Sequence, residues 1–107
     1  MSKITQKIEL TTVGEILKKE FMDPNHISAY FLAKSIDVPV SRIQDIIHDR
    51  RTITVDTSIR LARFFGLSDT YFINISNEIE SRKAIEENSQ SFDKIIPFSN
   101  LKLAKIG

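Results

Sequence analysis

The sequence predicts an all-α protein in which five short helices form one domain between two terminal segments. Apolar residues recur at helical spacing in five separate stretches, and no stretch shows the sustained alternation of a half-buried strand. Most of these stretches begin at a Ser, Thr or Asp suited to capping a helix. With 107 residues and 41% hydrophobic content, the chain suffices for one modest core. We therefore expect an N-terminal arm over residues 1–11, a domain over 12–88 and a C-terminal tail over 89–107.

The first predicted helix covers residues 12–22. Thr12 and Glu15 have the spacing of a capping box, in which both side chains bond backbone N–H groups that the first turn leaves unpaired. Pro24 disfavours helical geometry at the residue before it. The chain is therefore expected to turn directly after this helix.

The second and third predicted helices follow at short spacing. Ser28 is suited to cap a helix that ends near Asp37. Pro39 suits the first turn of the next helix, expected over residues 39–49, because its missing N–H is not needed there. The side chains expected to face the core are Phe31, Leu32, Ala33 and Ile36 in the second helix and Ile43, Ile46 and Ile47 in the third.

A fourth helix is predicted between a capping Thr54 and Gly66, which favours the left-handed conformation that ends many helices. A fifth begins near Ser68 and Asp69 and is expected to end by Asn88. The inward-facing side chains are expected to be Ile59, Ala62 and Phe65 in the fourth helix and Phe72, Ile75 and Ile79 in the fifth. The tail holds apolar residues that are expected to pack on the chain itself or on a partner; they are Phe92, Ile95, Ile96, Phe98 and Leu101.

The composition excludes several classes of function. The chain has no Cys, which excludes disulfides and thiolate metal sites. Its N-terminus has no apolar signal core, and no apolar run approaches the roughly 20 residues of a membrane span, so we expect a cytoplasmic protein with no membrane partner. The two His stand in separate segments and the three Gly form no phosphate-binding loop. We therefore expect no enzyme activity, no catalytic residue, no cofactor and no metal site.

Residues 28–49 have the form of a helix-turn-helix unit, in which two short helices are joined by three or four residues and a small residue, here Ala33, lies at their contact. The basic excess of the chain also lies in its middle, where residues 28–66 hold six basic and four acidic side chains. An ordinary corner between two helices would show the same spacing. From spacing alone, both interpretations stay open.

The residue pattern over about residues 13–80 resembles the antitoxins of the HigA or VapI type, within the lambda-repressor-like group of helix-turn-helix proteins. The order and spacing of the matching segments are kept throughout. They are Gly14-Glu15-Ile16-Leu17, Glu20-Phe21, Leu32-Ala33, Val38-Pro39-Val40-Ser41-Arg42-Ile43, Arg51, Ile53-Thr54, Asp56-Thr57, Arg60-Leu61-Ala62-Arg63 and Phe65-Gly66. The chain departs from the pattern near the fifth helix, at Asp69, Phe72 and Ile75-Ser76, and at Asp49, where the family usually has Gly. Asp tolerates the left-handed conformation that Gly favours.

The resemblance implies a sequence-specific DNA-binding antitoxin of a type II toxin–antitoxin pair, which represses its own operon as a homodimer and neutralises a small ribonuclease toxin. Two alternatives remain. A free-standing transcriptional repressor would share the DNA-binding unit and lack the toxin partner. A protein-interaction module that has lost DNA binding is suggested by four aspartates near the presumed DNA face, namely Asp37, Asp45, Asp49 and Asp56.

In a helix-turn-helix unit, the N-terminal residues of the second helix enter the major groove. Val40 is expected to be exposed and to meet a thymine methyl group, with core packing as the alternative. Ser41 and Gln44 are expected to contact base edges. Asp45 suits a cytosine amino group, whereas Arg42 suits either a base edge or a phosphate.

Residues that flank this helix are expected to hold the DNA backbone. Arg50 and Arg51 suit phosphate oxygens because guanidinium groups pair well with them. Ser28 and His48 complete the predicted DNA-binding residues. The predicted dimer interface, formed together with the tail, consists of Phe72, Ile75 and Ile79. Apolar anchors for the toxin are expected in the N-terminal arm, at Ile4, Ile8 and Leu10.

Overall fold

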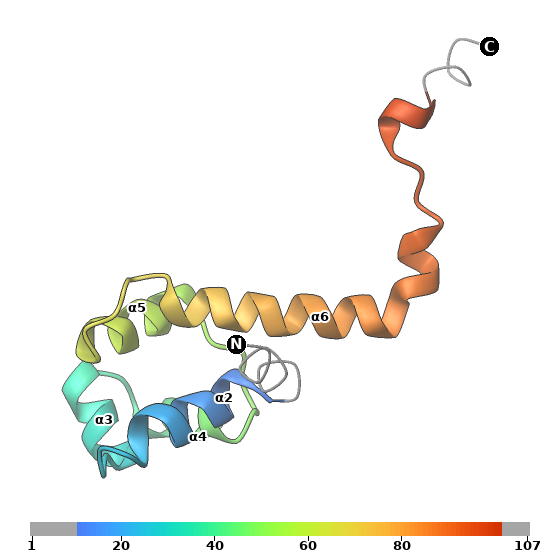
Figure 1. The fold of residues 1–107 in the computed structure, drawn as a ribbon. Helices are drawn as coiled ribbons and strands as arrows, with labels where there is room; N and C mark the ends of the chain where they lie inside the picture. Colours follow the sequence, from blue (N-terminus) through green and yellow to red (C-terminus); the bar gives the residue numbers. More distant parts are fainter. Residues whose placement is uncertain (1–10, 102–107) are drawn as a thin grey trace.

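Helices make up most of the part of the chain that the structure, a computed structural model, describes, which is residues 11–101. Helices α2 to α5 form a body, α6 extends along one side of it, and the end of the chain projects away (Figure 1). The elements are α2 (Val13–Ile16) with a π-helical continuation (Leu17–Met22), α3 (Ala29–Ile36), α4 (Val40–Ile47), α5 (Val55–Phe64), α6 (Tyr71–Asp93) and a 3₁₀ turn (Phe98–Leu101). With α2 and its continuation taken as one helix, the predicted all-α class and the five predicted helices are confirmed.

Three helices begin at the predicted caps. The hydroxyl oxygens of Thr12, Ser28 and Thr54 accept hydrogen bonds from backbone N–H groups three residues later, at 3.1, 3.0 and 3.2 Å. Each bond satisfies a donor that the first helical turn leaves unpaired. Gly66 has a φ of +72°, the left-handed conformation predicted for it after α5. Helix α4 begins one residue later than predicted, because Pro39 takes the cap position.

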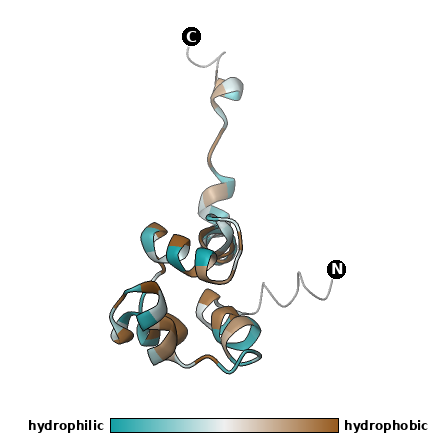
Figure 2. Cartoon of the chain, turned by 90° about the vertical axis from the view of Figure 1, so that its left-hand side faces the viewer, coloured by the Kyte–Doolittle hydropathy of each residue, from teal (hydrophilic) through white to brown (hydrophobic). Residues whose placement is uncertain are grey.

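The core is one cluster to which every helix contributes. Its most deeply buried side chains are Leu17, Leu32, Ala33, Ile43, Ile46, Leu61, Ala62 and Phe72. Each large side chain among them stabilises the fold by roughly 1.5–3 kcal/mol on burial. Figure 2 shows hydrophobic and hydrophilic residues alternating along the helices of the body, as one buried and one exposed face require.

The start of α2 meets the end of α4 at very short range. A β-carbon at Gly14 would lie 2.0 Å from the carbonyl oxygen of Ile46, so only glycine fits there. The Thr12 hydroxyl donates to the carboxylate of Asp49 at 3.1 Å and ties the same two segments together. Asp49 has a φ of +59°, so the loop keeps the left-handed conformation that Asp tolerates.

The predicted inward faces of α3 and α5 are wrong in part. Phe31 is 56% exposed, because the next residue of α3 takes the inward position. Its ring instead meets the ring of Phe64 edge-on, with centroids 6.4 Å apart. In α5, Leu61 shares the fully buried face with Ala62, whereas Ile59 is half-buried.

An aromatic cluster fixes the start of α6 on the body. The ring of Phe21 lies 5.1 Å from that of Phe65, 5.8 Å from that of Tyr71 and 5.2 Å from that of Phe72. Such tilted and edge-on pairs add roughly 0.5–1.5 kcal/mol each beyond the area they bury. The first turn of α6 is therefore part of the core.

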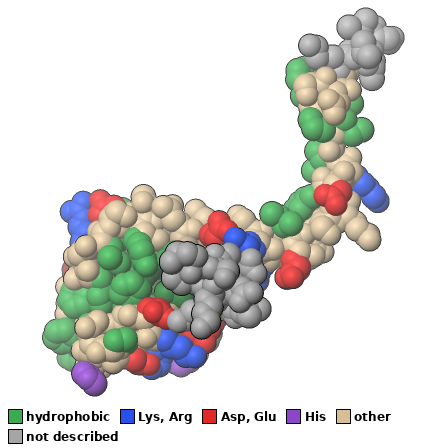
Figure 3. All heavy atoms as spheres, in the orientation of Figure 1, with side chains coloured by type: hydrophobic (Ala, Val, Ile, Leu, Met, Phe, Trp, Pro, Cys, Tyr) green, Lys and Arg blue, Asp and Glu red, His purple; other side chains and the backbone are tan. Residues whose placement is uncertain are grey.

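Helix α6 is longer than predicted and is broken where it was expected to end. It runs to Asp93, but Asn88 has φ −127° and ψ 24°, which are not helical values. Beyond the break the chain turns away from the body, and Figure 3 shows hydrophobic side chains along this projecting part. Its exposed side chains are Phe92 (43%), Ile95 (70%), Ile96 (56%) and Phe98 (67%). Of the two alternatives expected for these four residues, packing on the body of the chain does not occur, and packing on a partner stays a prediction.

Candidate nucleic-acid interface

Helices α3 and α4 are joined by a turn of three residues. Asp37 ends α3 in the left-handed conformation, with a φ of +63°. The backbone N–H of Val38 then donates to the carbonyl of Ala33 at 3.0 Å. Ala33 and Ile43 have no exposed surface, because the two helices pack directly on each other. This is the arrangement of a helix-turn-helix unit.

The outward side of α4 carries four of the predicted base-contacting residues. They are Ser41, which is exposed, and Arg42, Gln44 and Asp45, which are half-buried. Ile43 and Ile46 occupy the opposite side of the helix and are buried. Ser41 and Asp45, four residues apart, therefore share the outward side of α4, and Arg42 and Gln44 flank it on either side.

Val40 differs from its prediction. It is half-buried and packs against the core, whereas exposure was expected. The reason is its register, because Val40 lies one turn before the buried Ile43 on the same side of α4. Val40 therefore stands at the edge of the outward face.

Asp45, Arg50 and Arg51 form a cluster at the end of α4. The carboxylate of Asp45 places Oδ1 3.1 Å from Nε of Arg50 and Oδ2 3.8 Å from Nε of Arg51. The backbone N–H of Arg50 also donates to the Asp45 carbonyl at 2.7 Å. The sequence assigned these three residues separate roles. The feature that brings them together is the left-handed conformation of Asp49, which turns the chain back beside α4.

Ser28 and His48 are exposed at the beginning of α3 and the end of α4. The Ser28 hydroxyl is engaged in capping α3. Nδ1 of His48 lies 2.9 Å from the carbonyl oxygen of Gln44. Sequence reasoning missed Arg60, whose guanidinium donates to the Ile36 carbonyl at 3.0 Å and so ties α5 to the end of α3.

The three residues predicted for a dimer interface lie mostly inside the chain. Phe72 has no exposed surface, Ile79 is 5% exposed and Ile75 is half-buried. They face inward because α6 uses this stripe to cover the body, with Phe72 in the core cluster. A dimer surface on α6 or the tail therefore has to come from other side chains.

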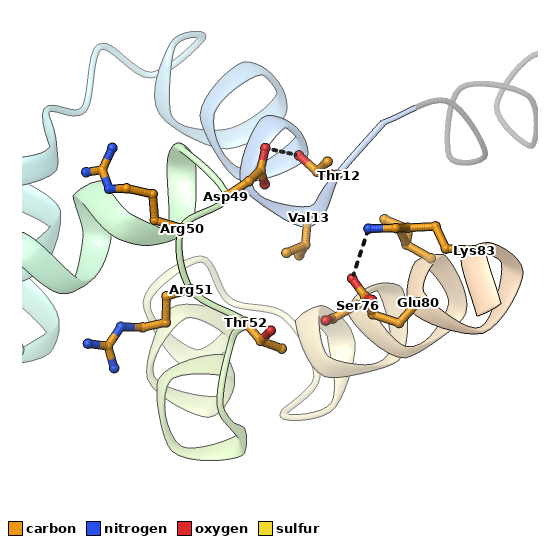
Figure 4. Close-up of a pocket in the computed structure, with 10 residues that line it drawn as sticks. Thr12, Val13, Asp49, Arg50, Arg51, Thr52, Ser76, Glu80 and Lys83 are labelled. Atoms are coloured by element: carbon orange, nitrogen blue, oxygen red, sulfur yellow. Dashed lines mark hydrogen bonds and ion pairs between the residues drawn. The ribbon is translucent and has the colours of Figure 1, made fainter. Parts of the chain in front are cut away.

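A hollow of about 260 Å³ lies between the start of α2, the loop after α4 and α6 (Figure 4). Arg50 and Arg51 border it, but Figure 4 shows both side chains pointing away from it. Across the hollow, Lys83 of α6 lies 4.0 Å from the carboxylate of Glu80. The two arginines thus belong to the side of α4 and not to the hollow.

Within residues 11–101, no group of three or more His, Cys, Asp or Glu is placed to hold a metal ion. No helix in the same part of the chain is long and apolar enough to cross a membrane.

An ion pair with shifted pKa values lies in the turn before α6. Arg63 donates to both carboxylate oxygens of Asp69, at 3.0 and 2.9 Å, in the turn before α6. This hydrogen bonding lowers the pKa of Asp69 and raises the pKa of Arg63. The hydrogen bond to Glu15 likewise raises the pKa of Lys19. The Arg63–Asp69 pair joins the end of α5 to the turn before α6.

The three-residue turn, the small residue at the helix contact and the outward polar face together define a helix-turn-helix protein. The profile of the helix-turn-helix family matches residues 18–72, and the chain belongs to this family. Virulence-associated protein I of Dichelobacter nodosus is 41% identical over 86 residues, which are 80% of this chain and 79% of that protein.

Solved structures are similar over most of the chain. The antitoxin HigA of Pseudomonas aeruginosa, solved with the higBA promoter, has a TM-score of 0.75 at 31% identity, over 82% of this chain and 97% of that one. PA4674 of Pseudomonas aeruginosa, in complex with its operator DNA, has a TM-score of 0.78 at 31% identity, over 82% and 94%. The predicted resemblance to HigA- and VapI-type antitoxins is confirmed.

Proposed function

We propose that this chain is a sequence-specific DNA-binding antitoxin, which represses its own operon and neutralises a small ribonuclease toxin. The outward face of α4 carries the proposal, because polar side chains there stand beside two arginines on a helix whose inner residues are buried in the core. Relatives with this fold at 31% identity were solved with promoter or operator DNA. Helix-turn-helix proteins place such a helix in the major groove and use adjacent cations to contact phosphates.

In this proposal, Ser41, Gln44 and Arg42 contact base edges in the major groove. Arg50 and Arg51 bind phosphates and fix the register, with Ser28 and His48 as weaker backbone contacts. Val40 meets the groove only with the part of its side chain that the core leaves uncovered.

The chain is proposed to bind as a homodimer. A dimer places two recognition helices about 34 Å apart, on successive turns of one face of DNA. Its interface is assigned to the exposed apolar residues of distal α6 and the tail, because Ile85, Ile95 and Phe98 are 57%, 70% and 67% exposed. This replaces Phe72 and Ile79, which the core already covers.

The toxin is proposed to dock outside the helix-turn-helix unit. Exposed glutamates follow α6 and suit a basic partner, since complementary charge steers encounter and suppresses wrong pairings; they are Glu78, Glu80, Glu86 and Glu87. The apolar anchors proposed in the arm, Ile4, Ile8 and Leu10, lie outside the described residues.

The proposal is tested in two assays. In the first, the full chain is titrated onto the DNA that precedes its own reading frame and onto a shuffled duplex, with Arg82→Ala on α6 as control for the loss of an arginine. Selective binding that survives in the control and weakens in Arg50→Ala is expected. A chain that binds neither duplex is not a DNA-binding protein.

In the second assay, the chain is co-expressed with the protein encoded next to it. Co-purification, together with toxicity of the neighbour when this chain is absent, is expected of an antitoxin. If the neighbour is harmless and does not co-purify while DNA binding holds, the protein is a free-standing repressor.

A further inference from the structure

The Asp45 carboxylate lies where a DNA phosphate would have to compete with it. Its two oxygens face Arg50 and Arg51 at 3.1 and 3.8 Å. The side chains of the two arginines are 58% and 48% exposed, and that of Asp45 is 30% exposed. One anion therefore already engages both cations assigned to phosphate, on the side of α4 that is open to solvent.

A carboxylate and a phosphate oxygen use the same guanidinium donors. A guanidinium presents its N–H groups in a planar fork that fits either anion. To bind phosphate through Nε, Arg50 has to leave Asp45, and the carboxylate then stands beside the DNA backbone without its partners. The carboxylate and the nearby phosphate repel each other, because both are negative. This repulsion weakens every complex in which the carboxylate does not meet a new hydrogen-bond donor.

We propose that Asp45 is an internal competitor for DNA phosphate, which holds Arg50 and Arg51 in the DNA-free chain and thereby determines specificity. This rests on the proposed DNA-binding function. A base edge with an amino group toward the major groove, such as cytosine N4, compensates the released carboxylate. Sites that lack such a donor at this position leave the carboxylate uncompensated, so Asp45 penalises unspecific DNA more than the operator.

The backbone around the cluster supports this assignment. Asp49 is left-handed with a φ of +59°, and the Arg50 N–H is bonded to the Asp45 carbonyl at 2.7 Å, so the loop presents both arginines to this carboxylate. Thr12 binds the carboxylate of Asp49 and fixes the same loop from α2. Release of the arginines therefore requires side-chain rotation alone, with no change of the loop.

The test is Asp45→Asn, which keeps the shape of the side chain and removes its charge. Affinity is measured for a random-sequence duplex and for a duplex from the DNA upstream of the chain's own reading frame, over a series of salt concentrations. Because the variant no longer has to break two exposed ion pairs before it binds, its affinity for random DNA should rise about three- to tenfold. We expect a smaller gain for the upstream duplex, a lower discrimination ratio and a steeper salt dependence, because the variant no longer has an internal pair that salt weakens.

The matched control is Asp69→Asn. It makes the same change in net charge and also breaks an aspartate–arginine pair, here a pair of Asp69, in the turn before α6, with the single residue Arg63. A second comparison places Asp45→Asn in a chain that also carries Arg50→Gln and Arg51→Gln, where the gain should disappear if Asp45 acts through the arginines. Thermal unfolding by circular dichroism checks that each variant folds.

The outcomes separate the two proposals. If the wild-type chain binds neither duplex, the proposed function fails and this inference fails with it. If the wild type binds its upstream duplex selectively and Asp45→Asn changes no affinity, only the inference is overturned. It is also overturned if Asp69→Asn gives the same gain, or if the gain persists without the two arginines. Should Asp45→Asn unfold, the NMR signal of the Arg50 Nε–H in the wild type decides, because a chemical shift that added DNA leaves unchanged means that Arg50 has not changed its partner and contradicts a competitor.

Discussion

The body and the tail of this chain use the same apolar residue types in opposite ways. In the body, Leu32, Ile43 and Leu61 have no exposed surface. Beyond the break at Asn88, Ile95 and Phe98 are 70% and 67% exposed. The body therefore holds what it needs to fold, whereas the tail carries apolar surface suited to a partner. In the proposed function, the body binds DNA and the projecting segment serves assembly.

Truncation in the body should have the largest effect. Leu32→Ala should destabilise the chain by about 3–5 kcal/mol, because the cavity cannot collapse between α3 and its neighbours. The same kind of change in the tail, Ile95→Ala, should alter stability by less than about 0.5 kcal/mol. Urea unfolding of both variants measures this, and equal losses would mean that tail and body form one core.

Gly14→Ala should have the next largest effect on the free energy of unfolding. The new β-carbon would meet the Ile46 carbonyl oxygen, a backbone atom, at 2.0 Å, so α2 has to move away from α4. We expect a loss of about 2–3 kcal/mol. Gly66→Ala is the control, since nothing lies within 4 Å of its β-carbon and only the positive φ is strained, which costs about 1 kcal/mol. A smaller loss at Gly14 than at Gly66 would contradict the close crossing of α2 and α4.

Alanine at Ser41, Arg42 or Gln44 should relax base preference without unfolding the chain. Each side chain that touches a base edge provides about 1–3 kcal/mol of discrimination between matched and mismatched sites. Binding to a panel of single-base variants of the operator measures this. If all three variants fold and keep the wild-type preference, a different face enters the groove.

Alanine at Arg50 or Arg51 should weaken binding to all sequences alike. The slope of log affinity against log salt should fall by about 0.9 for each phosphate that the variant no longer neutralises. Wild-type salt dependence in the single and double variants would show that these arginines do not reach phosphate.

Removal of residues 89–107 should have the smallest effect on stability and a clear effect on assembly. The described tail side chains bury little surface within the chain, so we expect a change of less than about 0.5 kcal/mol. Sedimentation should show the truncated chain as a monomer where the full chain is a dimer. If the truncated chain remains dimeric, the dimer interface lies in the body or in the rest of α6.

Local chemistry made much of the fold predictable. Thr12, Ser28 and Thr54 cap the helices as expected, because a cap depends only on its own side chain and the next turn. The end of α6 was not predictable in this way, since no breaking residue stands at Asn88 and the residues after it tolerate a helix.

The sequence predicted which residues belong to the candidate site better than how they lie relative to one another. The register of the isoleucines in α4 is consistent with the exposure of Ser41, whereas Gln44 is half-buried at the flank of the outward side. Whether Val40 is covered depends on the neighbouring helices, and whether Asp45 meets Arg50 depends on the backbone conformation of one residue, Asp49. Pattern alone determines neither of these.

In the proposed arrangement, the body binds specific DNA sequences while the tail pairs two copies of the chain. A hydroxyl-radical footprint of the full chain on the DNA upstream of its own reading frame tests both parts at once. We expect two protected half-sites on one face of the duplex, with centres about 34 Å apart and related by two-fold symmetry. A single unsymmetric patch would contradict the paired arrangement, and uniform or absent protection would contradict sequence-specific reading by α4.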